Sequence, residues 1–267
     1  MRALALLLAC GALLGACTTT TTTTSTPGNV AEGRSMRTPG EGDPEKRARA
    51  RLDLASAYLA QGQPQTALDE AKLALAAKPD MADAYSLLGL IHGALGDTRQ
   101  AEDSFRRALQ LAPTDADAMH NYGWFLCNQR RYPESEAQFA AALAQPEYRD
   151  SARTLLAQGV CQARAGRWDE AERTLGRSFE RDPGNPAISF NLAEVLYQRG
   201  EYERARFYIK RVNSVPDYVN AQSLWLAARV ERRMGNMPGV QDFARQLHER
   251  FPQSPEVARL DQGRFDD

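Results

Sequence analysis

The four cysteines and three histidines among the 267 residues of this sequence do not form a catalytic constellation. His92, His120 and His248 stand singly, without the His-Glu-x-x-His spacing or a second acid at fixed spacing that zinc hydrolysis requires. The sequence also lacks a glycine-rich loop of the kind that binds phosphate. We therefore expect no catalytic site, no metal and no cofactor, and we expect the protein not to be an enzyme.

Residues 1–17 have the pattern of an export signal. Arg2 supplies a positive charge, residues 3–14 are apolar, and Leu14-Gly15-Ala16 forms a small-residue cleavage site before Cys17. The apolar stretch is too short to span a bilayer. The pattern resembles a bacterial lipobox, which implies that the signal peptide of residues 1–16 is removed and that Cys17 is lipidated. A plain secretory signal with an incidental Cys17 is the alternative.

Lipidation at Cys17 would determine where the protein resides. Several acyl chains on one residue anchor a protein durably, whereas a single chain binds a membrane only marginally. In Gram-negative lipoproteins the residue after the lipidated cysteine tends to decide the membrane. Thr18 is not the aspartate that resembles an inner-membrane retention signal. We expect a lipid-anchored protein on the periplasmic face of the outer membrane.

Residues 17–42 have the composition of a disordered tether. Seven consecutive threonines occupy positions 18–24, and proline and glycine follow with almost no apolar residues. Such a segment cannot bury enough apolar surface to fold. A flexible chain of this length spans about 25–30 Å root-mean-square, which would lift the folded part off the lipid surface. Low-complexity filler without a selected length is an equally good interpretation.

A repeat of about 34 residues dominates the rest of the chain. Its frame is clearest from residue 82, where Tyr85, Gly89, Gly96, Phe105 and Pro113 fall at unit positions 4, 8, 15, 24 and 32. These positions resemble the tetratricopeptide (TPR) pattern, in which each unit is a pair of helices. Six units fit the frame, starting near residues 48, 82, 116, 152, 186 and 221. We expect ordered structure from residue 43, a solenoid over 43–252, and a tail over 253–267 with a possible short helix.

Each repeated position has a packing reason. Positions 8 and 20 must be small because the two helices of a unit cross there, and position 24 holds a large side chain between helices. Position 15 follows the first helix, where glycine accepts positive φ. The third unit departs from the pattern, because Arg130 and Ser135 stand where glycine and alanine are usual. The repeats predict an all-α, right-handed superhelical solenoid of six TPR units.

Cys127 and Cys161 are the cysteines that remain beside Cys17 once the signal is removed. They lie on the first helices of adjacent units, at unit positions 12 and 10. Parallel stacking of these helices in an oxidising compartment would favour a disulfide. Two buried free thiols are the alternative, since an error of one helical turn would separate the sulfurs beyond bonding distance.

The inner face of such a solenoid is the expected partner-binding surface. With 33 Lys and Arg against 34 Asp and Glu and no basic run, the chain has no footprint for nucleic acid, and we expect no small-molecule substrate either. Unit positions 2, 5, 9 and 12 of the first helices would line a groove with anchors for an extended peptide or an amphipathic helix. The predicted groove residues are Leu90, His120, Trp124, Leu156, Val160, Phe190, Tyr197 and Trp225, beside Asp83, Ser86, Cys127, Arg153, Glu194, Arg229 and Arg232. Trp124 could equally fill the interface between units three and four.

Two further segments of the sequence narrow the choice among families of TPR proteins. The segment Asn121-Tyr122-Gly123-Trp124-Phe125-Leu126-Cys127 is followed by Gly159-Val160-Cys161, and a lipobox precedes six TPR units. Together they resemble the type IV pilus biogenesis and stability lipoproteins, the PilF/PilW pilotin family. The resemblance implies an outer-membrane lipoprotein that helps the secretin subunit of the pilus reach the outer membrane and assemble into its multimeric pore. A general periplasmic TPR scaffold that recruits peptidoglycan or outer-membrane assembly proteins would share these features and is the alternative.

Overall fold

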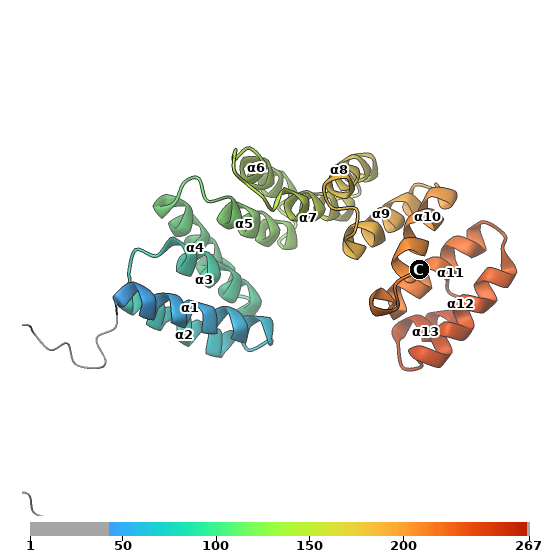
Figure 1. Cartoon of the computed structure of the whole chain (residues 1–267), viewed down its shortest axis with the longest axis horizontal. Coiled ribbons are helices and arrows are strands. Elements are labelled where there is room, and N and C mark those ends of the chain that lie inside the picture. The colour runs from blue at the N-terminus through green and yellow to red at the C-terminus, as the bar shows by residue number, and fades with distance from the viewer. Residues whose placement is uncertain (1–42, 266–267) are drawn as a thin grey trace, which may run out of the picture. The chain divides into compact units, whose positions relative to one another are not determined.

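The computed structural model describes residues 43–265, so the predicted signal peptide, Cys17 and the tether lie outside the described residues. Within 43–265 the chain forms thirteen α-helices, one short 3₁₀ helix and no strand. Twelve of the helices form six consecutive pairs (Figure 1), which confirms the predicted all-α TPR solenoid. The first helices are α1 (Pro44–Ala60), α3 (Ala82–Leu95), α5 (Ala116–Asn128), α7 (Ser151–Arg164), α9 (Pro186–Gln198) and α11 (Ala221–Arg233). The second helices are α2 (Pro64–Ala77), α4 (Thr98–Leu111), α6 (Tyr132–Leu143), α8 (Trp168–Arg181), α10 (Tyr202–Asn213) and α12 (Met237–Arg250).

In the three central repeats the two helices cross where a glycine meets a large side chain. A Cβ atom added to Gly89 would lie 2.7 Å from the ring of Phe105, which is fully buried. The same steric restriction holds in the next two repeats, where added Cβ atoms would meet Phe139 at 2.9 Å and Leu175 at 2.6 Å. Because a real Cβ atom essentially never lies this close to a side chain that is not bonded to it, the glycine at position 8 lets the helices approach. Phe105 then stacks on Tyr122 of the following repeat, with ring centroids 5.3 Å apart.

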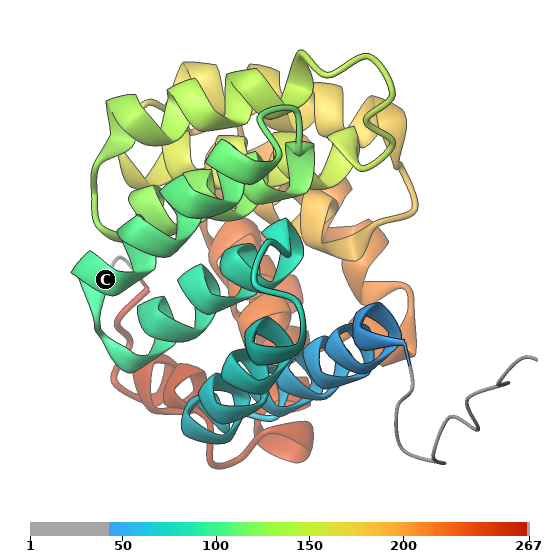
Figure 2. The same cartoon turned by 90° about the vertical axis from the view of Figure 1, so that its left-hand side faces the viewer.

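The first helices lie on the inner side of the curve. Each first helix contacts the first helix of the next repeat, whereas among the described residues the second helices of adjacent repeats do not pack closely on one another. A row of helices bends toward the side on which its members are closer together. Figure 2 shows the helix pairs stacked one after another, and Figure 1 shows α6 and α8 outside α5 and α7. The inner face is therefore built from α1, α3, α5, α7, α9 and α11.

Ion pairs link the second helix of one repeat to the following repeat on the outer side. Arg131 contacts Glu102 of the preceding repeat at 2.7 Å, and Arg167 contacts Glu136 at 2.8 Å. Hydrogen bonding from Arg131 is the main reason that the pKa of the Glu102 carboxyl is lowered. Between repeats five and six the arginine lies on the preceding repeat and the acid on the following one. Here Arg206 of α10 donates to the buried carboxylate of Glu231 of α11 at 2.6 Å.

The last repeat is covered by the end of the chain. Helix α13 (Pro255–Asp261) packs against α11 and α12, and Phe265 packs its ring on Trp225 with centroids 5.0 Å apart. The Arg229 guanidinium donates from Nε to the carbonyl oxygen of Phe265 at 3.0 Å. These contacts bury the apolar face that a terminal repeat would otherwise expose to solvent.

The turn between the two helices of every repeat has a residue with positive φ at position 15. Five of these residues are glycines, with φ between 72° and 84°, and the sixth is Arg130 with φ of 60°. The hydrogen bond that closes the turn is the same in both kinds, since Arg131 N–H donates to Leu126 O at 3.0 Å as Asp97 N–H donates to His92 O at 2.8 Å. The departure at Arg130 is therefore in the residue type and not in the turn.

Replacing Arg130 by glycine should stabilise the protein. A residue with a Cβ pays about 1 kcal/mol to adopt this left-handed conformation, and the Arg130 side chain is exposed. We expect Arg130→Gly to raise the free energy of unfolding by about that amount in urea denaturation. Gln129→Gly is the matched control, because Gln129 has a φ of −82° that any residue adopts, and it should not stabilise. An equal or lower unfolding midpoint for Arg130→Gly would contradict this account of the turn.

Candidate partner-binding groove

A hollow of about 490 Å³ opens on the inner face between the first helices of repeats one to four. Its walls combine carboxylates with a short apolar floor, and we call it the acidic groove. It is lined by Ser56, Asp83, Ser86, Leu87, Leu90, Asp115, Asp117, Ala118, Asn121, Asp150 and Arg153. Leu90 is the one residue of the predicted anchor set that lies in this groove, and three of the polar residues predicted beside the anchors, Asp83, Ser86 and Arg153, line it too.

The charge of the acidic groove is negative. Four aspartates face it, and Arg153 is the only basic residue in its lining, paired with Asp117 at 3.3 Å. Burial raises the pKa of Asp117, and the nearby carboxylates of Asp115, Asp150 and Asp83 raise it further, while Arg153 acts in the opposite direction. Carboxylates that destabilise one another's charge attract a cation, so the groove fits a segment that carries Lys or Arg.

Local structure holds the polar lining in place. Asp115 caps α5, because its side chain accepts from the Ala118 N–H at 3.0 Å, and Asp150 stands at the N-cap position of α7. The amide of Asn121 donates to the Ser86 hydroxyl at 3.2 Å and links α5 to α3. The partly buried side chains of Leu87 and Leu90 lie between these polar groups, where an apolar side chain of a ligand would be desolvated.

Four other predicted anchors are partly buried and lie outside the acidic groove. Trp124 packs on the cluster formed by Cys127, Phe139 and Cys161, and the Arg164 guanidinium lies 4.7 Å above its ring. Trp124 thus lies at the interface between repeats three and four. Leu156 and Phe190 pack against apolar clusters farther along the solenoid, and Val160 is also partly buried.

The structure contradicts the prediction that His120, Tyr197 and Trp225 line the groove. Their exposed fractions are only 8%, 6% and 4%. They occupy unit positions 5 and 12, which are seven residues apart and so form one stripe along a helix. In these three repeats this stripe faces the neighbouring helix and not solvent, since His120 contacts Thr154 of α7 and Arg229 of α11 lies over the Tyr197 ring. Trp225 is covered by Phe265.

Sequence reasoning missed Leu87, Asn121 and three of the four aspartates of the acidic groove. Asp117 stands at unit position 2, which the repeat frame assigns to the groove, so a signal for it was present. Asp115 and Asp150 precede the first residues of their helices and are recognisable as capping residues. Only the structure shows that two caps and two residues at position 2 converge on one hollow.

No group of three or more His, Cys, Asp or Glu within 43–265 could hold a metal ion. None of the helices in the same range is long and apolar enough to cross a membrane.

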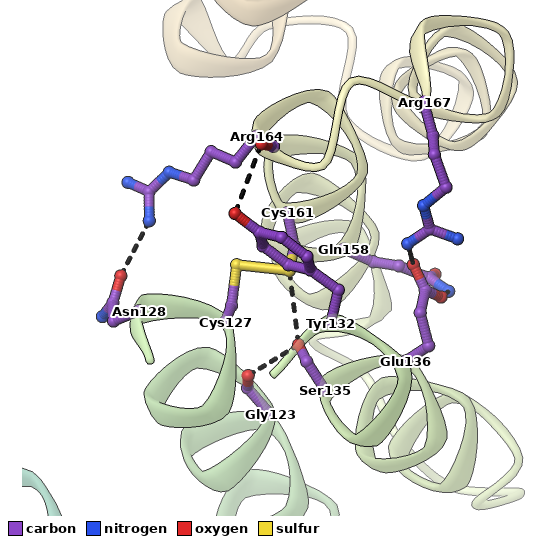
Figure 3. The surroundings of a disulfide bond; sticks show 10 residues. All are labelled: Gly123, Cys127, Asn128, Tyr132, Ser135, Glu136, Gln158, Cys161, Arg164 and Arg167. Atoms are coloured by element: carbon purple, nitrogen blue, oxygen red, sulfur yellow. Dashed lines mark hydrogen bonds and ion pairs between the residues drawn. A yellow bond between two sulfur atoms is a disulfide. The ribbon is translucent and has the colours of Figure 1, made fainter. Parts of the chain in front are cut away.

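The contact between α5 and α7, which we call the seam, holds repeats three and four together at the end of the acidic groove. Cys127 and Cys161 form a disulfide in the structure, with Cα atoms 5.8 Å apart. Figure 3 shows that Ser135 reaches the same place, donating from its hydroxyl to the Gly123 carbonyl at 2.7 Å, with the Cys161 sulfur at 3.4 Å. This contact explains why a serine stands at position 20 of the third repeat.

The two-position offset between the cysteines is a property of the whole seam. His120 contacts Thr154 across it, at 2.8 Å between Nδ1 and Oγ1. Both pairs are 34 residues apart in the sequence, and on each helix their members are two turns apart. The third repeat is two residues longer than the 34-residue period, and residues 144–150, which join it to the fourth repeat, accommodate the extra length. Tyr148 from this loop also forms a hydrogen bond with the Thr154 hydroxyl, at 2.7 Å between the oxygens.

The disulfide predicts a specific thiol count. Protein purified without reductant and then denatured should have no titratable thiol at Cys127 or Cys161. Reduction should lower the free energy of unfolding by at most about 4 kcal/mol, because the closed loop restricts the unfolded chain. The double variant Cys127→Ala/Cys161→Ala should lose stability without reductant and be insensitive to it. Two titratable thiols in the never-reduced protein would overturn the bridge.

His120 predicts a loss of stability at acidic pH. Burial, together with the charge of Arg153, lowers the pKa of His120 from 6.5 to about 4. Between these pH values the unfolded chain binds a proton that the folded chain does not, so stability falls as the pH falls through this window. The loss amounts to about 2–3 kcal/mol. Urea unfolding at pH 7 and pH 4.5 should show a smaller decrease for His120→Asn than for the wild type. Equal decreases would contradict this assignment.

Comparison with known proteins agrees with the architecture. Tetratricopeptide-repeat family profiles match residues 43–82 and 126–186, 82–115, 104–137 and 162–217. The type IV pilus assembly protein PilF of Pseudomonas aeruginosa is 26% identical over 207 residues, which make up 78% of this chain and 82% of PilF. An uncharacterized protein of Haemophilus influenzae is 31% identical over 144 residues, which make up 54% of this chain and 80% of that protein.

Solved structures give the same result at the level of the fold. The structure of PilF from Pseudomonas aeruginosa matches with a TM-score of 0.70 at 24% identity, over 82% of this chain and 99% of PilF. The crystal structure of PilW, described as a widely conserved type IV pilus biogenesis factor, matches with a TM-score of 0.74 at 30% identity. This match covers 80% of the present chain and 97% of PilW. The chain therefore belongs to the family of tetratricopeptide-repeat proteins of type IV pilus biogenesis that includes PilW.

Proposed function

We propose that this protein is an outer-membrane pilotin lipoprotein that binds the secretin subunit of the type IV pilus and promotes its localisation and multimerisation. The observation that carries the proposal is its similarity to the biogenesis factor PilW over 97% of that protein. The lipobox ending at Cys17 supports anchoring at the outer membrane, with the tether leaving the solenoid in the periplasm.

The acidic groove is the docking site in this proposal. Its aspartates would hold Lys or Arg side chains of a secretin segment, and Leu87 and Leu90 would contact an apolar residue between them. Charged groups around such a groove speed association and select the partner, whereas the desolvated apolar contact supplies most of the affinity. The bound subunit would then reach the outer membrane with the lipid anchor.

The anchor can be tested in cells that lack the native gene. Cys17→Ser removes the thiol that lipidation needs, so the protein should leave the membrane fraction while the solenoid stays folded. We expect the amount of multimeric secretin in the outer membrane, measured on gels without heat denaturation, to fall strongly. Membrane retention of Cys17→Ser would refute the lipoprotein assignment.

The groove can be tested in the same cells with two charge reversals. Asp83→Lys/Asp117→Lys inverts two walls of the acidic groove, and we expect about tenfold less secretin multimer with normal amounts of the anchored protein. Asp69→Lys/Asp103→Lys is the matched control, because both of its aspartates are exposed at position 22 of the outer helices α2 and α4. Equal multimer levels in the two double variants would rule out the groove as the docking site. Normal multimer levels without the protein would favour the general scaffold instead.

A further inference from the structure

The outer face of α8 carries a row of arginines that form no ion pair within residues 43–265. Arg173, Arg177 and Arg181 are spaced four residues apart, so they share one face of the helix, and all three are exposed. Within residues 43–265 none of them forms an ion pair, although Glu172 of the same helix pairs with Arg199 and Arg204 of the next repeat. Helix α8 therefore uses its acid at position 21 for stability and leaves the arginines at positions 22, 26 and 30 free.

The neighbouring helix α10 continues this face with an aromatic and a basic group. Phe207 is 56% exposed, which makes it the most exposed large apolar side chain among the described residues. Arg211 lies between two rings, with its guanidinium carbon 5.4 Å from the Phe179 centroid and 5.9 Å from that of Phe207. Phe179 of α8 packs edge-on against Tyr208 of α10 at 5.3 Å, so side chains of the two helices meet on this face although their backbones do not pack closely.

Arg211 also forms the wall of a pocket of about 280 Å³ beside this surface. One of its Nη atoms donates to the Pro183 carbonyl at 3.1 Å, and this bond with the two rings fixes the guanidinium plane. A guanidinium has five N–H groups, so donors remain for a carboxylate. The rest of the pocket combines Ser189 and Ser214 with apolar side chains, among them Val215 and Tyr218, which are 38% and 41% exposed.

We propose that the outer face of α8 and α10 is a second docking surface, which binds an acidic protein segment. A carboxylate of the segment accepts hydrogen bonds from Arg211, and a neighbouring apolar side chain enters the pocket against Val215 and Tyr218. Further acidic residues of the segment pair with Arg177 and Arg173. Charge complementarity identifies the occupant, since Lys210 and Arg211 add to the three arginines of α8, and these five basic residues outnumber the exposed carboxylates Glu180 and Glu203. Asp169 and Glu170 at the start of α8 already pair with Arg199 and Arg167. The pocket favours a peptide over a membrane, because it accepts one side chain beside a fixed hydrogen-bond donor. This surface lies on the opposite side of the repeat from the acidic groove and selects a partner of opposite charge.

A peptide probe tests the proposal with the full chain carrying Cys17→Ser, so that no lipid anchor interferes. The probe is a short fluorescein-labelled peptide that alternates Asp-Glu pairs with single Phe residues. Its binding to the protein is measured by fluorescence anisotropy. We expect saturable binding that weakens as NaCl is added. Arg177→Glu should weaken binding about tenfold and Phe207→Ala about threefold, with unchanged circular dichroism and thermal midpoints.

Two matched controls and two further probes make each outcome decisive. Arg107→Glu reverses a charge at the same unit position on α4, and Leu73→Ala removes a comparably exposed apolar side chain of α2, so neither should change the affinity. The same peptide with Lys in place of every acid should not bind. Equal effects of Arg177→Glu and Arg107→Glu, or binding of the Lys peptide, would overturn the proposal. Binding to phosphatidylglycerol vesicles in the absence of peptide binding would assign the surface to a membrane and would overturn it as well.

Discussion

The steric fit between positions 8 and 24 in the three central repeats is the constraint on which the rest of this structure depends. Where position 8 is Gly89, Gly123 or Gly159, the facing residue is Phe105, Phe139 or Leu175, and no space is left for a Cβ atom. A large buried ring needs a glycine opposite it if the helices are to stay close. The central repeats therefore draw their apolar burial from a few large side chains, and these also contact the next repeat.

The close crossing has consequences for the inner face. Because adjacent first helices touch, the stripe at positions 5 and 12 becomes part of the core in several repeats and can hold a disulfide or a buried histidine. Positions 2 and 9 remain nearer the solvent, and they line the groove together with the N-cap aspartates, Leu87 and Asn121. Function on the inner face is thus confined to what the packing between first helices leaves open.

The repeat frame made most of the fold predictable, since Tyr85, Gly96 and Pro113 each have a local physical reason to occur where they do. Even the unusual Arg130 marks a turn of the expected geometry. The prediction that His120, Tyr197 and Trp225 line the groove was wrong because the rotation of each helix about its axis depends on its neighbours and on Phe265. The convergence of four aspartates likewise depends on how adjacent repeats are stacked, which one repeat cannot specify.

Hydrogen–deuterium exchange of the protein with and without the periplasmic part of the secretin subunit tests the central claim most directly. Backbone amides in a contact surface exchange more slowly when a partner orders and covers them. Slower exchange in α3, α5 and the start of α7, with little change in α4 and α6, is the result that docking in the acidic groove predicts. Slower exchange confined to the second helices, or none anywhere in a mixture shown to contain the complex, would contradict it.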